Sequence, residues 1–552
     1  MLMQKLVQSL KQAVVQAQQT GTFVSTTLPE IVVEHPQNPE HGDYASNLPL
    51  KLSRAMGITP LVIAQRLVEL MPSMAEVDEV TVAPPGFINF TLRNDWLTEQ
   101  VELIISKGAS YSDIDLGKGK RTQLEFVSVN PTGPLHIGHG RGAVIGSTLA
   151  KVLVAAGYSV AREYYINDTG SQINAFKRSL YARYQQCLGT AVELPTNGYF
   201  GNYLVDLAKE IFKEQGDRFI KLPEEEAIQK LGEIGLNRIM EGIKRDLKLL
   251  DVNFDVWFSE QSLYRHGQYE KAMALLRDKG YITKKENAVW FVSTALGEDK
   301  DNVLVRSDNS PTYFASDVAY HYNKFLERQF DKVINIWGAD HQGHVSRMRA
   351  VVSALGIDPE RLKIIICQLV TLRRGKKIIR VSKRSGDLIT LRELMDEVNP
   401  DICRFFFLSR SADSQMDFDL ELAKKQSVDN PVYYVQYAHA RIASILRLAR
   451  EREINYEQGD VSLLTSEPEL TLIRKMVLLP EIVETVANTL EPHHLPYYAQ
   501  DLATAFHSFY KQCRVISEDK ALTWARLKLV RATQIVLSKT LHLMGMTAPE
   551  QM

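Results

Sequence analysis

Residues 124–142 read LEFVSVNPTGPLHIGHGRG, and this stretch decides how the centre of the chain folds. It begins with LEFVSV (124–129), a short apolar run typical of a β-strand, and passes through a loop rich in glycine and proline. An apolar helical pattern follows over 140–156, and a second strand-like run, VAREYYIND, stands at 160–168. Strand, glycine loop, helix and strand in this order form the first unit of a parallel α/β sheet. The stretch therefore predicts a Rossmann-like domain.

The length and composition are those of a large protein with several domains. The chain has 552 residues, 45% of them hydrophobic, and 65 basic side chains nearly balance 66 acidic ones. This length exceeds what one hydrophobic core organises. A net charge of −1 does not exclude a nucleic-acid partner, because a basic face can be balanced by acidic side chains elsewhere. The four cysteines are dispersed, no apolar run reaches membrane-spanning length, and the N-terminus lacks a signal-peptide core. We expect a cytoplasmic protein with no membrane contact.

The Rossmann-like domain is expected to cover residues 111–395. Buried-strand patterns return in VINIWGADHQGH at 333–344 and in KIIICQLVTL at 363–372. Between them and the first unit, residues from about 175 to 300 are more charged and helical, and we interpret them as an insertion.

Two further domains flank this one. Residues 1–110 combine helical stretches, one of them at 50–71, with a strand-like end at 82–92, and they predict a small α+β domain. Residues 396–552 predict an all-α bundle, with long amphipathic helices at 432–450 and 524–545. Gly545 is the expected C-cap of the last helix. The sequence thus predicts a multidomain α/β protein.

The glycine loop holds His136 and His139, and two imidazoles there can bind a metal, serve as acid and base, hold a phosphate or simply cap the helix. A metal site needs further ligands with their own spacing, so an HxxH pattern alone is weak evidence for one. The position favours phosphate, because such loops lie at the ligand-binding edge of a parallel sheet and the helix start offers N–H groups to an anion. Gly138 lets a nucleotide approach the backbone closely. We interpret the loop as a nucleotide-phosphate cradle.

A second cationic segment, IIRVSKRSGDLITL at 378–391, follows the last predicted strand. Nine Lys or Arg and no acid lie between residues 361 and 384. Lys383 and Arg384 can close over a triphosphate, and nucleotidyl transfer depends mostly on charge stabilisation of this kind. The alternative interpretation is a solvated basic hairpin.

Together, HIGH at 136–139 and the VSKR loop resemble the HIGH and KMSKS motifs of the class I aminoacyl-tRNA synthetases. HIGH matches fully, whereas in RVSKR (380–384) Arg380 stands for the first lysine and Lys383 keeps the later one. Other segments resemble the arginyl-tRNA synthetases in particular, in the order of that family. These segments are PEHGDYASN (39–47), PPGFINF (84–90), EYYINDTGSQI (163–173), YFASDVAYH (313–321), WGADHQGHVSRM (337–348) and NPVYYVQYAHARI (430–442).

The resemblance implies a ligase that works in two steps. The carboxylate of L-arginine attacks the α-phosphate of ATP, and the arginyl group then passes to the 2′-hydroxyl of the terminal adenosine of an arginine-specific tRNA. The resemblance also implies that the first step needs bound tRNA and that the protein is a monomer. Mg²⁺ would accompany ATP rather than fill a cage of protein ligands. The matching catalytic and ATP-binding positions are His136, His139 and Lys383, with Gly138 and Arg384 also at ATP.

A guanidinium is a planar cation with five donors, so acidic and polar acceptors must read it. The positions that match the family's arginine pocket are Glu125, Asn130, Tyr313, Asp317, His341 and Gln342. Of these, Asn130 resembles the residue that holds the amino and carboxylate end of the amino acid. Without the resemblance, Glu125 would be interpreted as a solvent-facing acid at a strand end and Asp317 as a helix N-cap.

The outer domains resemble the family's tRNA-binding parts. The tyrosines, cations and polar groups near residue 433 suit splayed anticodon bases, although tyrosines at helical spacing are usually core residues. Asn47 and the segment 87–89 are candidates for contact with the tRNA elbow. The anticodon candidates are Tyr433, Tyr437 and Arg441, flanked by Tyr434, Gln436 and His439, of which Tyr437 or His439 is expected to serve partly as core.

Three rival interpretations fit less well. A small cytidylyltransferase with an HxGH loop would be much shorter and would lack the helical C-terminal region. A non-catalytic tRNA-binding paralogue would lose His136, His139 or Lys383, and all three are present. Cysteine and methionine synthetases usually carry zinc-ligand cysteines, and a glutamate or glutamine enzyme would want cations in its pocket. We identify no second catalytic cluster within residues 175–300, so the sequence does not indicate an editing domain.

Overall fold

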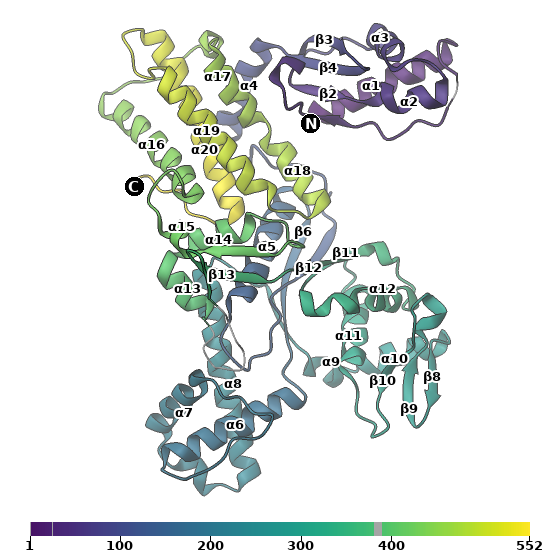
Figure 1. Ribbon diagram of the computed structural model, residues 1–552, viewed down its shortest axis with the longest axis vertical. Helices are drawn as coiled ribbons and strands as arrows, with labels where there is room; N and C mark the ends of the chain where they lie inside the picture. Colours follow the sequence, from purple (N-terminus) through teal and green to yellow (C-terminus); the bar gives the residue numbers. More distant parts are fainter. Residues whose placement is uncertain (1, 25, 380–388) are drawn as a thin grey trace.

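The computed structural model describes residues 2–24, 26–379 and 389–552 (Figure 1). Its centre is a five-stranded sheet in the order β12-β11-β5-β6-β7, in which every neighbouring pair is parallel. The chain runs outward from β5 to β7 and returns on the other side of β5 as β11 and β12. The order therefore reverses between β5 and β11, where such folds bind ligands at the carboxyl ends of the strands. The predicted Rossmann-like fold is confirmed. The strands are β5 (Arg121–Glu125), β6 (Ser159–Ile166), β7 (Val256–Ser259), β11 (Lys332–Gly338) and β12 (Leu362–Cys367).

The first unit differs in detail from the prediction. Strand β5 ends at Glu125 instead of continuing to residue 129, because Val127 and Ser128 adopt positive φ angles of 69° and 43° that end the extended run. Helix α5 (Ile137–Ala155) begins three residues before the predicted start. Its glycines allow close packing, since a Cβ at Gly146 would lie 2.2 Å from Cγ of Phe126.

The stretch 175–300 is not one continuous insertion. Helices α6 (Ser171–Cys187), α7 (Asn202–Gln215) and α8 (Glu224–Leu249) form a unit with its own core, at the lower end of the molecule in Figure 1. The chain then returns to the central sheet as β7, which pairs with β6. After β7, a second unit adds the antiparallel sheet of β8 (Ile282–Lys285), β9 (Ala288–Phe291) and β10 (Asn302–Val305) and the helices α9 (Gln261–Arg265), α10 (Gln268–Asp278) and α11 (Tyr313–Tyr322).

The N-terminal region packs helices on an antiparallel sheet in the order β1-β2-β4-β3. The helical stretch predicted at 50–71 is divided, because Gly57 ends one helix in the left-handed region and Pro60 begins the next. Helix α4 leads on to the C-terminal bundle and packs against its helices α17 and α20. The elements are α1 (Leu2–Gln19), β1 (Val33–Glu34), β2 (Tyr44–Ser46), α2 (Leu48–Met56), α3 (Pro60–Leu70), β3 (Val77–Ala83), β4 (Phe87–Leu92) and α4 (Asn94–Lys107).

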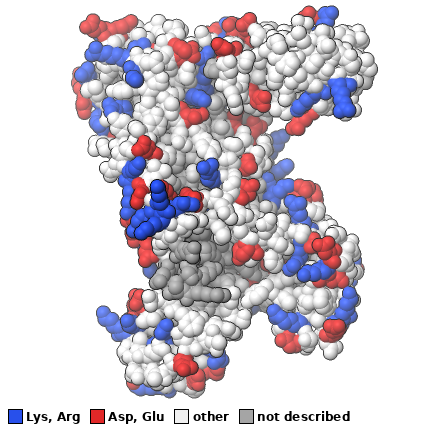
Figure 2. All heavy atoms as spheres, in the orientation of Figure 1, with Lys and Arg blue, Asp and Glu red and all other residues white. Residues whose placement is uncertain are grey.

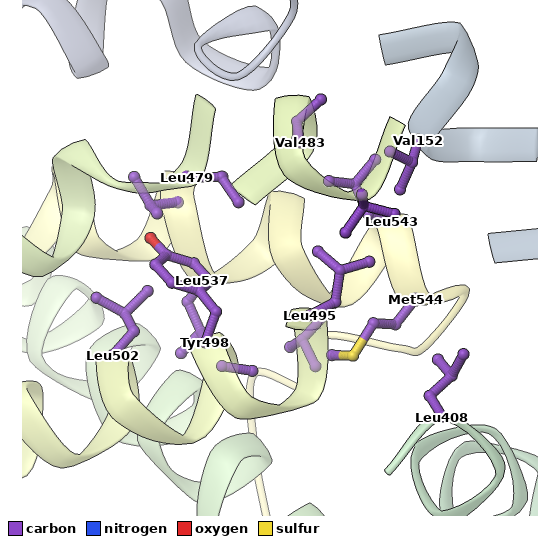
Figure 3. Packing of buried hydrophobic residues seen from close by; sticks show 14 of the residues in the cluster. Val152, Leu408, Leu479, Val483, Leu495, Tyr498, Leu502, Leu537, Leu543 and Met544 are labelled. Atoms are coloured by element: carbon purple, nitrogen blue, oxygen red, sulfur yellow. The ribbon is translucent and has the colours of Figure 1, made fainter. Parts of the chain in front are cut away.

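The C-terminal region is helical, as predicted, and Gly545 is the left-handed C-cap of the last helix. Its core continues into the Rossmann-like domain, since Figure 3 shows Val152 of α5 close to the bundle residues Val483 and Leu543, and all three belong to one core cluster. No described helix is long and apolar enough to cross a membrane. The helices are α13 (Leu391–Val398), α14 (Pro400–Leu408), α15 (Leu420–Lys424), α16 (Pro431–Glu451), α17 (Glu467–Val477), α18 (Leu479–Thr489), α19 (His494–Gln512) and α20 (Lys520–Met544).

A small mixed sheet lies between the two regions. The run predicted as one strand at 363–372 divides at residue 368, so that β12 completes the central sheet and β13 (Val370–Arg374) starts the next one. Strand β13 pairs antiparallel with β14 (Lys377–Ile379) and parallel with β15 (Met416–Asp419).

Candidate active site

The two histidines of the glycine loop cap helix α5. His136 is the N-cap, its backbone N–H donates to Nδ1 of His139 at 3.2 Å, and the backbone N–H of His139 donates to the His136 carbonyl at 3.0 Å. The two rings stack with centroids 3.4 Å apart. The capping role weighed from the sequence is therefore present. It also places both imidazoles at the positive end of α5, where a phosphate is stabilised.

The chain that follows the predicted cationic loop docks on the same histidine. His136 forms an isolated β-bridge with Thr390, and the N–H of Leu391 donates to the carbonyl of Leu135 at 2.8 Å. Thr390 is in turn fixed as the N-cap of α13 by a capping box with Glu393. The far side of the loop begins at β14, which is paired to β13.

Arg380, Lys383 and Arg384 lie outside the described residues. Around the neighbouring strands the surface is rich in cations, and Figure 2 shows Lys and Arg gathering on the side where Figure 1 places β13 and α13. Arg374 and Lys424 share one partner there, Glu397, at 2.8 and 2.7 Å.

Three carboxyl groups converge at the carboxyl edge of the central sheet. Glu125 ends β5, Glu260 follows β7, and Asp317 lies in the middle of α11. Burial, then the charges of Glu125 and Glu260, raise the pKa of Asp317 to about 7, while Lys324 and Arg347 oppose that rise. Asp317 is only half-buried, so a ligand can reach it. An acid beside two other acids favours the binding of a cation, because an added positive charge relieves their repulsion.

Both alternative interpretations of these acids are wrong. Glu125 is only 6% exposed, so it is no solvent-facing acid. The N-cap of α11 is Thr312, whose side chain accepts from the N–H of Ala315, and Asp317 lies inside the helix. Glu125 therefore faces the interior, and Asp317 does not cap its helix.

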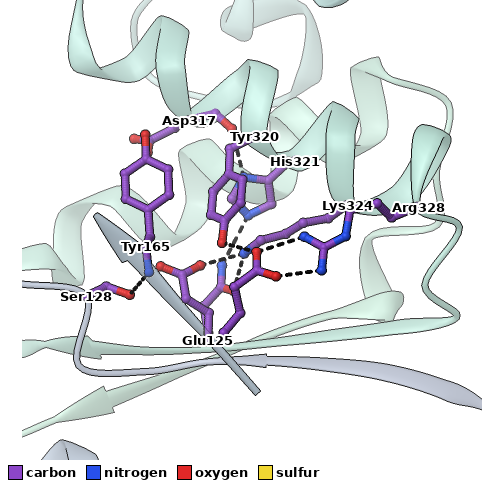
Figure 4. Close-up of polar contacts among 10 residues, drawn as sticks. Glu125, Ser128, Tyr165, Asp317, Tyr320, His321, Lys324 and Arg328 are labelled. Atoms are coloured by element: carbon purple, nitrogen blue, oxygen red, sulfur yellow. Dashed lines mark hydrogen bonds and ion pairs between the residues drawn. The ribbon is translucent and has the colours of Figure 1, made fainter. Parts of the chain in front are cut away.

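A buried polar chain links two of the acids (Figure 4). Oε2 of Glu125 accepts from Nζ of Lys324 at 2.5 Å, and the same ammonium donates to Oδ1 of Asn335 at 2.9 Å. The side-chain amide of Asn335 lies 3.1 Å from Nε2 of His321, whose Nδ1 lies 2.8 Å from the Asp317 carbonyl. Burial, followed by the charge of Lys324, lowers the pKa of His321 to about 3, so its ring is neutral.

Sequence reasoning missed Glu260, Lys324 and a second buried ion pair. Glu163, which is fully buried on β6, accepts from Arg328 at 2.9 and 2.5 Å and from the hydroxyl of Tyr320 at 2.5 Å. A faint signal was available, because Lys324 follows Asp317 by seven residues, or two helical turns.

The other predicted pocket residues lie along the same edge of the sheet. The Asn130 amide donates to Oε1 of Gln172 at 2.5 Å, and the Tyr313 hydroxyl lies 3.0 Å from where a Cβ of Gly170 would stand. His341 and Gln342 are exposed in η6 (Ala339–His344), the turn that follows β11. The His341 ring centroid lies 5.9 Å from that of Trp337.

Comparisons with known proteins decide the family. The family described as tRNA synthetases class I (R), catalytic domain, matches residues 100–406, and the Arginyl tRNA synthetase N terminal domain matches residues 4–92. The arginine–tRNA ligase of Dehalococcoides mccartyi is 60% identical over 547 residues, which are 99% of this chain and 98% of the relative. The chain belongs to the arginyl-tRNA synthetase family. This confirms the resemblance read from HIGH and the segments around it.

Two more members of the family agree. The arginine–tRNA ligase of Carboxydothermus hydrogenoformans is 50% identical over 523 residues, 94% of each chain. The structure of the Thermus thermophilus arginyl-tRNA synthetase has the same fold, with a TM-score of 0.80 over the whole of both chains at 23% identity.

The helical end of the chain matches the DALR anticodon binding domain over residues 435–552. On α16 the rings of Tyr433 and Tyr437 stack with centroids 6.0 Å apart, and the Arg441 guanidinium lies 5.2 Å from the Tyr437 ring and 5.3 Å from that of Tyr510. All of these side chains are partly exposed, so they form an aromatic and cationic surface.

Other residues near this surface stabilise the helical domain. His439 is 3% exposed, and its Nδ1 lies 2.9 Å from the Pro549 carbonyl, so it holds the C-terminal segment. The Gln436 amide donates to Asp401 at 2.7 Å, and the Tyr434 ring packs on His507. In the N-terminal domain Asn47 is the N-cap residue of α2, and its buried Oδ1 has no hydrogen-bond partner among the described residues.

Proposed function

We propose that the chain is an arginine–tRNA ligase whose arginine pocket is the cluster of Glu125, Asp317 and Glu260. The observation that carries this proposal is the convergence of three carboxyls at the carboxyl edge of the central sheet, where Glu125 ends β5 at the point where the strand order reverses. A guanidinium placed among them restores charge balance and meets acceptors on more than one side. Tyr313 and Asn130 then line the pocket beside Gly170 and Gln172. His341 and Gln342 line it from the turn after β11.

The reaction follows from what these groups do. Arginine's carboxylate is already ionised at neutral pH, so its attack on the α-phosphate of ATP needs no general base. His136 and His139, at the positive end of α5, stabilise the phosphates, and Gly138 lets adenine approach the backbone. Lys383 and Arg384 neutralise charge on the departing pyrophosphate, which is where catalysis of this transfer chiefly lies. The product of this step is arginyl-adenylate. The 2′-hydroxyl of the tRNA's terminal adenosine then attacks its carbonyl carbon, takes the arginyl group and releases AMP.

Mg²⁺ enters with ATP. Residues 126–139, which form the cradle, contain no carboxylate, so the cradle supplies none of the charged oxygen ligands that a magnesium site uses. The metal is held by the nucleotide's own phosphate oxygens and is part of the substrate.

Selectivity comes from the acceptors of the pocket. Lysine presents a point charge instead of a planar fork, so it leaves buried carboxylate oxygens without partners, at about 1–3 kcal/mol for each unsatisfied group. The pocket therefore rejects lysine without an editing site.

The tRNA is held by both outer domains. Stacking of splayed bases on Tyr433 and Tyr437, with Arg441 between two rings, supports an anticodon contact on α16. Asn47 and the segment 87–89 contact the tRNA elbow. The domains are residues 1–110, 111–395 and 396–552 of a cytoplasmic monomer.

ATP–pyrophosphate exchange, run with each standard amino acid and with or without total tRNA, tests this function. Exchange with arginine, and only when tRNA is present, supports both the substrate and a tRNA-dependent first step. Exchange with arginine in the absence of tRNA keeps the substrate and removes the tRNA requirement. No exchange by folded protein under any condition would instead favour a non-catalytic tRNA-binding paralogue.

A further inference from the structure

Lys324 is a fully buried cation without an assigned role. Its ammonium lies in the π-helical turn η5 (Asn323–Glu327), which continues α11, and it is 0% exposed. It contacts Oε2 of Glu125 at 2.5 Å and Oδ1 of Asn335 at 2.9 Å, and it lies 4.0 Å from the centroid of the Tyr320 ring. Burying an ammonium costs free energy unless the charge is paired, so we ask what the buried Lys324 does for the site.

The hydrogen bonds around Lys324 run in one direction. The ammonium can only donate, so Asn335 accepts with Oδ1 and offers its amide N–H₂ to His321. His321 is neutral, and its Nδ1 faces the Asp317 carbonyl, so Nδ1 carries the proton and Nε2 accepts from Asn335. Asn335 lies directly beside Glu125 in the register of β11 and β5.

We propose that Lys324 is a positioning residue of the arginine pocket, fixing Glu125 directly and the helical turn of Asp317 through Asn335 and His321. This inference rests on the pocket assigned under the proposed function. Lys324 occupies Oε2 of Glu125, so arginine is offered a carboxylate whose orientation is already set. Preorganised acceptors of this kind bind a ligand without first having to be ordered.

Lys324 also sets the charge that arginine meets. The charged and titratable groups that face Asp317 are Glu125 from β5, Tyr165 from β6, Glu260 after β7, Lys324 from η5 and Arg347 from α12 (Val345–Ala354). Glu125 and Glu260 disfavour ionisation of Asp317, whereas Lys324 and Arg347 favour it. Arginine binds when Asp317 is ionised, so its KM should fall as pH rises through about 7, the pKa that burial and the two acids give to Asp317.

A single and a double variant that break the same ion pair distinguish the positioning role of Lys324 from a purely structural role. Of the two charges in this pair, Lys324→Met removes only the one that favours ionisation of Asp317, so the midpoint of the KM profile should move up by about one to two pH units. Glu125→Gln combined with Lys324→Met also removes the larger, opposing charge of Glu125, so the midpoint should move down. The double variant keeps a neutral pair in the site, and it is expected to fold even if the single variant does not.

The experiment measures KM for arginine in aminoacylation between pH 5.5 and 8.5 at saturating ATP and tRNA, with kcat at saturating arginine. Opposite midpoint shifts, with kcat changing less than KM, support the positioning role. The inference is overturned if the midpoint shifts equally in the two variants or in neither. If the single variant does not fold, an unmoved midpoint in the double variant is sufficient to overturn it.

A third variant, Asp317→Asn, distinguishes a failure of the Lys324 inference from a failure of the proposed arginine pocket. A raised and pH-independent KM for arginine in that variant supports the pocket and leaves the Lys324 variants to decide the inference. A KM close to that of the natural chain overturns the pocket and the inference together.

Discussion

Replacing Gly146 by alanine should disturb the arginine pocket from the far side of β5. A Cβ at this position would lie 2.2 Å from Cγ and 2.4 Å from Cδ2 of Phe126, so the ring must retreat by about 1.2 Å to reach ordinary contact at 3.4 Å. Phe126 is fully buried, its ring centroid lies 4.4 Å from that of Phe254, and it directly follows Glu125. The retreat therefore moves the backbone that carries a pocket acid.

The magnitude is set by two opposing effects. Overpacking of a buried ring costs about 1–3 kcal/mol. Glycine to alanine inside a helix returns about 0.5–1 kcal/mol. The net loss is about 0–2.5 kcal/mol, which lowers the melting temperature by up to roughly 10 °C for a domain of about 150–250 residues. The KM for arginine should also rise, because a pocket displaced by about 1 Å binds and orients its substrate less well.

Gly142→Ala is the matched control, since Gly142 lies one turn earlier in α5 and no neighbouring segment among the described residues comes within 4 Å of its added Cβ. This variant should melt at or above the natural chain with an unchanged KM. Differential scanning calorimetry and arginine-dependent aminoacylation measure both quantities. If Gly146→Ala behaves like Gly142→Ala, Phe126 is free to move and the packing argument is refuted.

The remaining predictions concern the cationic loop, the anticodon surface and the N-terminal domain. Lys383→Ala should slow adenylate formation far more than it weakens arginine binding, and an unchanged pre-steady-state rate would contradict that role. Tyr437→Ala should raise the KM for tRNA by about 5- to 150-fold, as expected for a lost stacking partner, with the KM for arginine unchanged; equal KM values for tRNA would remove Tyr437 from the surface. His35 bonds Glu481 of α18 at 3.0 Å, and although burial lowers its pKa, Glu481 raises it to a net value above 6.5. The stabilisation is therefore complete below pH 6.5 and is lost as pH rises through the raised pKa. Proteolysis of the N-terminal domain should then increase with pH, and Glu481→Gln should flatten that increase; an identical profile in the variant would show that this pair does not hold the domain.

Local sequence determined the order of the central unit, the cap at Gly545 and the residue types at the phosphate cradle. These features depend on neighbours in the chain: alternation of apolar residues, a glycine free to adopt φ of 73°, and histidines at a helix start. Together with the segments spread along the chain, they were enough to identify the family and to name Glu125 and Asp317. They could not place the end of β5, because the positive φ angles of Val127 and Ser128 are imposed by the turn and not by residue type.

Tertiary structure alone decided the pairings between distant segments. Strand β7 is short and only half-buried, so it did not stand out within a charged region until its pairing with β6 placed it in the sheet. His439 became a core residue because the Pro549 carbonyl, 110 residues later, lies against it. Lys324 meets Glu125 across 199 residues because the strand order puts β11 beside β5 and the turn η5 brings its ammonium against Glu125 and Asn335. Burial strengthens the charge interactions of that ion pair and shifts the pKa values of the acids around it. The degree of burial depends on the assembled fold and not on the local sequence.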